Sequence, residues 1–178
     1  VPEMSKDVDR LKLVSDRFSK IGSTPQVEPT DLVIQVETML DYIKRRASGG
    51  IRFELHPPEE LPLIAPLSPT LFDWVIENLL KNALDAMDGK GTITIDIRKS
   101  VHEIIIDVSD TGKGIPGANV NKVFDPGFTT KKRGWGLGLS LSKRIIEQYH
   151  GGQLFVKASE PGKGTTFRIV LPREQKTV

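Results

Sequence analysis

The stretch that decides the fold runs from Asp110 to Leu139 and reads DTGKGIPGANVNKVFDPGFTTKKRGWGLGL. It begins with an aspartate and a glycine-containing turn, and it ends with a second glycine cluster that leads into a helical pattern. Glycine lets a backbone approach a ligand closely. A glycine-rich loop at the start of a helix attracts anions, because free N–H groups and the helix dipole point towards them. One such cluster could be only a turn, but two clusters on either side of a long segment predict a nucleotide pocket covered by a lid.

A predicted helix with a polar stripe precedes this stretch. Ser68 and Pro69 are a cap residue and a first-turn proline, and apolar residues then continue at helical spacing to about Met87. Residues three or four positions apart share one helix face; the polar ones are Asn78, Lys81, Asn82 and Asp85. An ordinary solvated face is the alternative. Because asparagine is a poor helix former, two asparagines one turn apart favour a binding site.

The remaining patterns indicate a sheet covered by helices. Alternating residues predict two hairpins, at 92–97 with 103–108 and at 154–158 with 165–171. The first hairpin delivers Asp110 to the end of a strand. Further elements are helices at 31–46 and 138–149 and short strands at 51–55 and 63–65. These elements predict an α/β fold, a two-layer α/β sandwich with a mixed, mostly antiparallel sheet.

An additional helix is predicted near the beginning of the chain. Apolar residues between 4 and 21 recur every three or four positions, and Gly22 would end the helix. An apolar helix face of this kind needs another apolar surface to pack against. The helix either packs on its own domain or belongs to a separate helical unit.

The composition narrows the class of protein. The chain has 178 residues, a net charge of +2 and 38% hydrophobic residues, which suits one domain or one domain with an additional piece. Because it has no cysteine, disulfides, thiolate chemistry and cysteine-based zinc sites are excluded. No apolar run approaches the ~20 residues of a membrane-spanning helix. The basic run at 131–133 lies inside the predicted lid, which favours contact with phosphates or solvent over a nucleic-acid partner.

Four motifs in order resemble those of the GHKL ATPase/kinase superfamily, most closely the catalytic ATP-binding domain of sensor histidine kinases. They are IENLLKNA at 76–83 (N box), DTGKG at 110–114 (first glycine box), FDPGFTT at 124–130 (F box) and GWGLGL at 134–139 (second glycine box). The resemblance covers residues 25–172. It implies the Bergerat ATP-binding fold, with ATP between the helical layer and the lid.

The resemblance also implies how the nucleotide base is held. It matches Asp110 to the acceptor of the adenine amine, a role that suits a carboxylate in a partly buried slot. Gly112 and Gly114 would let the backbone pass close to the base. The other residues expected to contact ATP are Ile115, Phe124, Thr129, Thr130, Gly134, Leu137 and Leu139.

For the phosphates, the resemblance implies a magnesium site on the polar stripe. Asn82 matches the metal-binding asparagine, and its carbonyl is the hard oxygen ligand that Mg²⁺ prefers. Asn78 would support metal-bound water or phosphate, and Lys81 and Lys131 are candidate phosphate-binding cations. These expectations make Asn78, Lys81 and Asn82 the candidate catalytic residues. Backbone N–H groups for the phosphates would come from Gly136 and Gly138.

One departure from the superfamily bears on the reaction. Hydrolysing relatives place a water-activating glutamate four residues before the metal-binding asparagine, and here that position is Asn78. A carboxamide cannot act as a general base. Glu77 is one residue away and should point about 100° around the helix. The sequence therefore favours a protein histidine kinase that moves the γ-phosphate of ATP to a histidine; a GHKL ATPase or a serine kinase of the same fold is the alternative.

The resemblance assigns residues 1–22 to the C-terminal part of a dimerisation and phosphoacceptor hairpin, and residues 23–178 to the catalytic domain. The first histidine of the chain is His56, so the helix with the acceptor histidine is expected outside these residues. Residues 1–178 alone are then not expected to autophosphorylate. Expected partners are that histidine, a second copy of the parent protein and the receiver domain of a response regulator, and not nucleic acid. The expected location is cytoplasmic, either free or as the cytosolic part of a membrane-bound sensor.

The composition of the lid gives a first prediction. Apolar residues are sparse between 115 and 135, so the nucleotide-free lid should open locally at low cost. Ligand at ~100 times its dissociation constant stabilises the bound form by about 2.7 kcal/mol. Trypsin should therefore cut at residues 131–133 early without nucleotide and more slowly with a Mg-ATP analogue.

Trp135 gives a second readout of the same event, because its emission should shift on binding and the shift should vanish in Trp135→Phe although Trp74 remains. Equal cleavage rates with and without saturating nucleotide would show that this segment is not ordered by the ligand.

Overall fold

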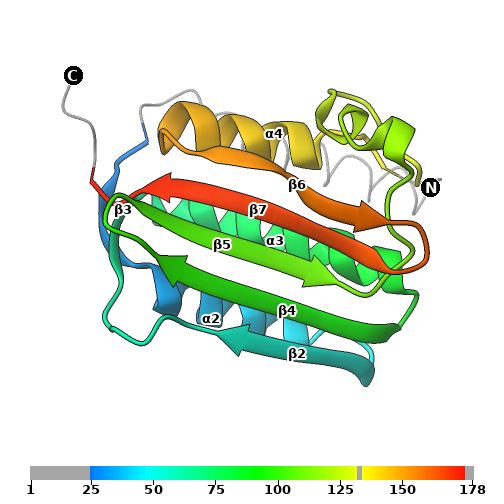
Figure 1. The fold of residues 1–178 in the computed structure, drawn as a ribbon, viewed down its shortest axis with the longest axis horizontal. Helices are drawn as coiled ribbons and strands as arrows, with labels where there is room; N and C mark the ends of the chain where they lie inside the picture. The colour runs from blue at the N-terminus through cyan, green and yellow to red at the C-terminus, as the bar shows by residue number, and fades with distance from the viewer. Residues whose placement is uncertain (1–24, 132–133, 175–178) are drawn as a thin grey trace, which may run out of the picture.

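In the computed structural model, a five-stranded sheet is covered by helices on one face and is open on the other (Figure 1). The structure describes residues 25–131 and 134–174. In chain order its helices are α2 (Leu32–Lys44), α3 (Pro69–Met87), α4 (Gly138–Arg144) and the π-helical turn η3 (Ile145–Tyr149). Its strands are β1 (Glu28–Asp31), β2 (Gly50–His56), β3 (Ile64–Leu67), β4 (Lys90–Lys99), β5 (Glu103–Asp110), β6 (Gln153–Glu160) and β7 (Gly164–Pro172).

The strand order of the large sheet is β2-β4-β5-β7-β6. Only the pair β2–β4 is parallel, and the other neighbours are antiparallel. The predicted two-layer α/β sandwich with a mixed, mostly antiparallel sheet is thereby confirmed. The β4–β5 hairpin sets Asp110 opposite Ile93, and the β5–β7 pairing sets it opposite Thr165.

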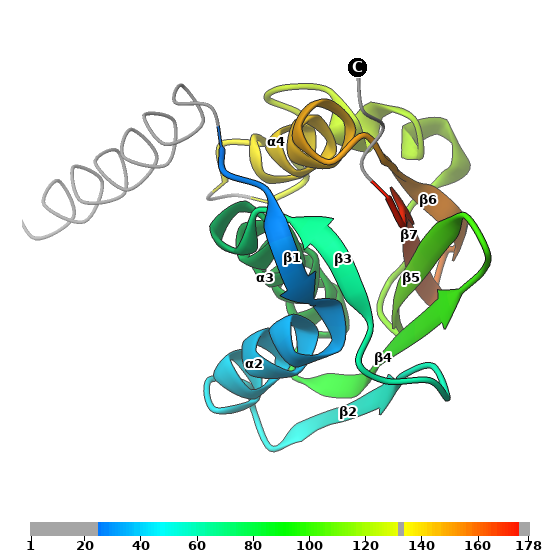
Figure 2. The same ribbon diagram turned by 90° about the vertical axis from the view of Figure 1, so that its left-hand side faces the viewer.

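Helix α3 forms the centre of the core. It lies between α2 and α4 against the sheet (Figure 2). Its apolar face is fully buried, with Phe72, Ile76 and Leu80 at 0% exposure. Every second residue of the central strands points towards it, because side chains alternate across a strand; examples are Ile93, Ile95, Ile104 and Ile106.

The helix ends agree with the sequence in part. Asp31 caps α2 and accepts hydrogen bonds from the N–H groups of Val33 and Ile34. Ser68 is the N-cap of α3, but its side chain makes no capping hydrogen bond. Instead its backbone N–H donates to Nε2 of His150, 3.1 Å away.

The helix predicted at 138–149 changes its winding after Arg144 and continues as η3. The helix predicted at 4–21, and with it the separate unit at 1–22, lies outside the described residues.

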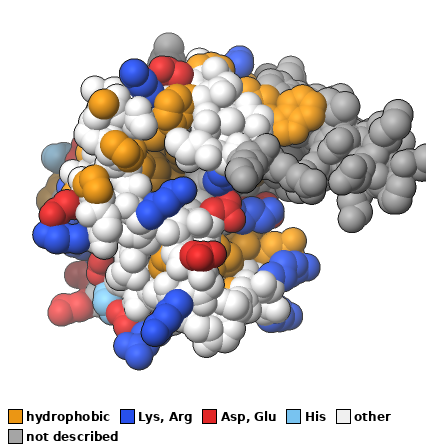
Figure 3. Space-filling view, turned by 90° about the vertical axis from the view of Figure 1, so that its right-hand side faces the viewer, with side chains coloured by type: hydrophobic (Ala, Val, Ile, Leu, Met, Phe, Trp, Pro, Cys, Tyr) orange, Lys and Arg blue, Asp and Glu red, His pale blue; other side chains and the backbone are white. Residues whose placement is uncertain are grey.

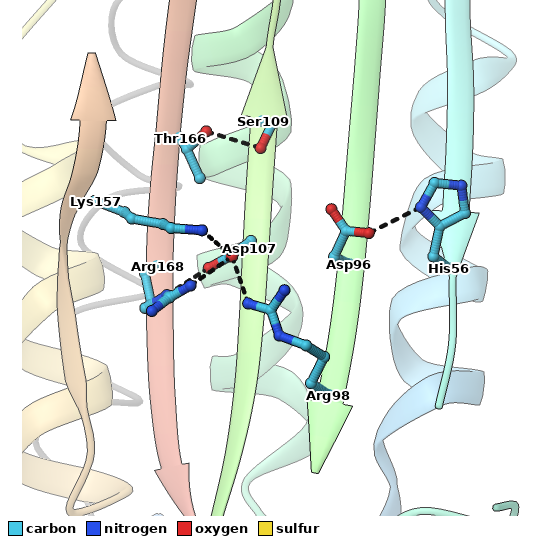
Figure 4. Close-up of polar contacts among 8 residues, drawn as sticks. All are labelled: His56, Asp96, Arg98, Asp107, Ser109, Lys157, Thr166 and Arg168. Carbon is cyan, nitrogen blue, oxygen red and sulfur yellow. Dashed lines mark hydrogen bonds and ion pairs between the residues drawn. The ribbon is translucent and has the colours of Figure 1, made fainter. Parts of the chain in front are cut away.

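The open face of the sheet holds one buried carboxylate among three cations (Figure 4). Asp107, on β5, has a side chain only 3% exposed. It accepts hydrogen bonds from Arg168 at 2.7 and 2.8 Å, from Arg98 at 2.7 Å and from Lys157 at 3.0 Å. Burial alone would raise the pKa of Asp107, but the hydrogen bonds from Arg168, Lys157 and Arg98 outweigh it and hold the pKa well below its usual range. This cluster ties β4, β5, β6 and β7 together.

We expect Asp107→Asn to destabilise the domain by roughly 1.5–3 kcal/mol at neutral pH, the scale of a hydrogen bond to a charged group. Because the pKa of Asp107 is lower in the folded chain, its contribution is complete above the unfolded pKa of about 3.9 and is lost as the pH falls. Urea unfolding of both proteins should show a difference that shrinks between pH 5 and pH 2. Asp96→Asn, on the same face, serves as the control, and a difference that does not depend on pH would contradict the account.

Candidate functional site

Asp110 is the last residue of β5 and lies on the face of the sheet that packs against α3. It is 9% exposed, and its Oδ1 accepts a hydrogen bond from the backbone N–H of Gly112 at 2.8 Å. Burial raises the pKa of Asp110, while backbone hydrogen bonds from Gly112 and Thr165 act in the opposite direction. Asp110 thus differs from Asp107, whose pKa is lowered by hydrogen bonds from three charged side chains.

The first glycine box is fastened on two sides. The N–H of Lys113 donates to the carbonyl of Ala86 on α3 at 2.9 Å, and the N–H of Gly162 donates to the carbonyl of Lys113 at 2.8 Å. Gly114 has a φ of +71°, and a Cβ on it would lie 2.2 Å from the carbonyl oxygen of Glu160. A side chain at this position would push the β6–β7 hairpin away from the first glycine box.

The N box touches the second glycine box directly. Asn78 donates through Nδ2 to Oγ of Ser142 on α4 at 3.0 Å. A Cβ on Gly138 would lie 2.3 Å from Oδ1 of Asn78. Helix α4 can therefore start against α3 only because position 138 has no side chain.

Lys81 and Glu77 form an ion pair on the neighbouring face of α3. Lys81 Nζ lies 2.5 Å from Oε1 of Glu77, and the Glu77 residue is 8% exposed. Glu77 is thus directed away from Asn78, as its position on the helix predicts. Lys81 is held by this carboxylate, so the structure does not show it free for phosphates.

A residue of the lid reaches the predicted metal ligand. Lys131 donates through Nζ to Oδ1 of Asn82 at 3.0 Å and also pairs with Oδ2 of Asp85. The structure therefore brings the N box and the F box together at the oxygen that the sequence assigns to Mg²⁺. An oxygen that already faces a positive charge fits a cation site.

The described residues contain no group of three His, Cys, Asp or Glu side chains that could hold a metal.

The first part of the lid is better anchored than its composition predicts. It contains two 3₁₀ turns, η1 (Gly117–Asn119) and η2 (Lys122–Phe124). The Phe124 ring packs edge-to-face on Phe167, with centroids 6.2 Å apart, and Nζ of Lys143 lies 4.8 Å from its centroid. The N–H of Gly127 donates to the carbonyl of Gly136 at 2.9 Å, which closes the rest of the lid into a loop.

The other residues predicted to contact ATP are distributed between this loop and the first glycine box, which begins at Asp110. Ile115 is half-buried and its N–H donates to Oγ of Ser159 at 2.8 Å. Leu137 and Leu139 are half-buried at the start of α4, and the exposed residues are Thr129, Thr130 and Gly134. Trp135 is 54% exposed. Figure 3 views the end of the molecule where β5 ends, and there basic and acidic side chains are interspersed.

Three polar residues of the site were not predicted from the sequence. Thr165 is 5% exposed opposite Asp110, and Ser159 links Thr165 Oγ1, at 2.8 Å, to the N–H of Ile115. Ser142 holds Asn78. Thr165 had a signal, since alternation places it on the same face as the core residues Phe167 and Ile169, where a polar residue is unusual.

A cavity of about 470 Å³ lies at the other end of β4, lined by residues 56–60 and 96–99. None of the motif residues lines it. His56 is exposed there, and its Nδ1 lies 2.8 Å from Oδ1 of Asp96.

Comparison with known proteins agrees with this geometry. Residues 68–175 match the family described as histidine kinase-, DNA gyrase B-, and HSP90-like ATPase. The sensor histidine kinase ZraS of Salmonella typhi is 36% identical over 178 residues, which are 95% of this chain and 37% of that protein. Sporulation kinase A of Bacillus subtilis is 42% identical over 100 residues, which are 56% of this chain and 16% of that protein.

Solved structures are similar over most of the chain. The nucleotide-free catalytic domain of histidine kinase ThkA superposes with a TM-score of 0.71 at 27% identity, covering 83% of this chain and 95% of that one. The mycobacterial sensor histidine kinase MprB gives a TM-score of 0.71 at 28% identity, covering 82% and 97%.

The chain belongs to the histidine kinase-, DNA gyrase B- and HSP90-like ATPase family, whose members bind ATP. Within that family it is an ATP-binding domain of the GHKL histidine kinase type. It spans 37% of the length of the ZraS relative.

Asp110→Asn should weaken nucleotide binding while the fold survives. The amide keeps an oxygen for the N–H of Gly112 but replaces the other acceptor with a donor facing the adenine amine. The expected cost is roughly 2–4 kcal/mol, or about 30- to 1000-fold in affinity. Calorimetry with an ATP analogue measures it, with Asp96→Asn as the control; unchanged affinity would remove Asp110 from the adenine role.

Proposed function

We propose that this chain binds Mg-ATP and passes the γ-phosphate to a histidine of a dimerisation helix, as the catalytic domain of a two-component sensor kinase. One observation supports the kinase reaction over hydrolysis most directly. Position 78, one turn before Asn82, has an amide bonded to Ser142, and the adjacent carboxylate of Glu77 is paired with Lys81. At the position one turn before the proposed metal ligand, where hydrolysing relatives carry their general base, this chain therefore has no carboxylate.

The proposed roles of the site residues follow from their positions. Asp110 and Thr165 hold the base, and Gly112 and Gly114 let the backbone approach it. Asn82 offers Oδ1 to Mg²⁺, and ATP supplies the phosphoryl group to be transferred. Lys131, directly after the F box, places its ammonium group 3.0 Å from Oδ1 of Asn82 and is suited to neutralise phosphate charge. Catalysis by positioning and charge neutralisation is sufficient for phosphoryl transfer.

The histidines of the chain are poorly placed as phosphate acceptors. His150 is buried, with Nδ1 bonded to the carbonyl of Ile145 at 3.0 Å and Nε2 to the N–H of Ser68. Burial, more than this hydrogen bond, sets its pKa, which is lowered. His102 precedes β5, whose other end is Asp110, roughly 26 Å away for eight residues at ~3.3 Å each. His56 lies on the edge strand β2. The acceptor is therefore proposed on a helix outside residues 1–178.

The proposed partners are a response-regulator receiver domain and a second copy of the parent protein. A structure of ThkA in complex with the response regulator TrrA has the same fold, with a TM-score of 0.76 at 24% identity. No helix in the described part of the chain is long and apolar enough to cross a membrane. A cytoplasmic location of this domain is part of the proposal.

Labelling with γ-labelled ATP tests the function. Residues 1–178 alone should bind the nucleotide but gain no acid-labile phosphate. The protein extended to include a dimerisation hairpin should gain acid-labile, base-stable phosphate. The Asn82→Ala variant of that extended protein should gain no phosphate, and its nucleotide binding should no longer depend on magnesium. Label on His56, His102 or His150, or acid-stable label on serine, would contradict the proposal.

A further inference from the structure

The contact of Lys131 with α3 involves the one oxygen that the metal would need. Lys131 Nζ lies 3.0 Å from Oδ1 of Asn82, while its second partner is the carboxylate of Asp85 one turn further along the helix. An ammonium group and a magnesium ion are both cations that approach this oxygen closely. Because a ligand of Mg²⁺ lies only 2.0–2.1 Å from the ion, the two cannot occupy the same position on Asn82 together.

Asp85 explains why the lysine stays there without a metal. The carboxylate lies three residues after Asn82 and therefore on the same face of α3. A neutral amide oxygen alone would hold an ammonium group weakly, whereas an adjacent carboxylate adds an opposite charge. The Lys131 and Asp85 side chains are 41% and 56% exposed, so the pair lies in the range of surface ion pairs, about 0.2–1 kcal/mol. Such a pair is strong enough to favour the position of the Lys131 ammonium group beside Asn82, and weak enough for the metal to displace it.

We propose that Lys131 and Mg²⁺ are alternative occupants of Oδ1 of Asn82, and that Asp85 is a positioning residue that keeps Lys131 on α3 until the metal–nucleotide enters. Entry of the metal releases the ammonium group, which then pairs with the phosphates that arrive with it. In this exchange a divalent cation replaces a monovalent one at the amide oxygen, and the phosphates that arrive with the metal bring the compensating negative charge. The inference rests on the proposed binding of Mg-ATP at this site.

The first experiment needs no nucleotide. In nitrogen-15 spectra of the free chain, the side-chain amide signals of Asn82 should shift in Lys131→Met and in Asp85→Asn. They should stay in place in Lys122→Met, which changes an exposed lysine of the same lid, and Asp85→Glu should restore the wild-type position. Unmoved Asn82 signals in Lys131→Met would overturn the contact itself, whatever the chain binds.

The second experiment measures the competition by calorimetry with a non-hydrolysable ATP analogue. Asp85→Asn should bind the magnesium complex roughly 1.5- to 5-fold more tightly, the equivalent of a surface ion pair. When EDTA removes the magnesium, Asp85→Asn should no longer bind the analogue more tightly than the wild type, because Lys131 can then remain on Asn82. In protein that also carries Lys131→Met, Asp85→Asn should not increase the affinity for the magnesium complex.

The outcomes separate the inference from the proposed function. Asp85→Asn could raise nucleotide affinity equally in the wild-type and Lys131→Met proteins, or equally with and without magnesium. Either result would mean that Asp85 simply repels the phosphates, and it would overturn the proposed exchange. A loss of affinity in Asp85→Asn would make Asp85 a metal ligand and would overturn it as well. Wild-type protein that binds no nucleotide would refute the proposed function, while the spectra would still decide the Lys131 contact.

Discussion

The structure depends on the packing of one helix, α3, which is both the centre of the core and a wall of the site. Its residues Phe72, Ile76 and Leu80 are fully buried against the sheet, so the helix cannot rotate without opening the core. Its polar stripe is fixed by the same packing. Asn78 consequently meets α4, and Asn82 meets the lid, at positions that the core determines.

Two carboxylates on β5 show how the same strand serves stability and binding. Asp107 faces the open side, where three cations pair with it and lower its pKa. Asp110 faces the helical side, where it accepts a hydrogen bond from the backbone N–H of Gly112 and burial raises its pKa. A desolvated carboxylate without a charged partner is typical of a functional site, which supports the proposed role of Asp110 in binding. The alternation of the strand thus places the ion-paired Asp107 and the candidate binding residue Asp110, three residues later, on opposite faces of the sheet.

The second glycine box is explained by contact as much as by flexibility. Gly138 lies against the amide of Asn78, which leaves no space for a side chain. That amide occupies the position where a hydrolytic relative needs a carboxylate. In the proposed kinase reaction, the amide that packs against α4 thus also stands where a hydrolytic relative would have its general base, which would link the packing of the two helices to the choice between transfer and hydrolysis.

The sequence by itself determined the fold class, nearly every strand and helix of the described chain and the residues of the four boxes, because periodicity and glycine spacing are local properties. Asp110 at a strand end and the asparagine stripe of α3 followed from that periodicity. Only the tertiary structure decided which partners these residues have: Lys81 with Glu77, Lys131 with Asn82 and Asp85, and Thr165 beside Asp110. The winding change after Arg144 and the anchoring of Phe124 on Phe167 also lay beyond the sequence. The physical reason is that such contacts join residues distant in the chain, whose approach is set by strand register and helix packing rather than by local spacing.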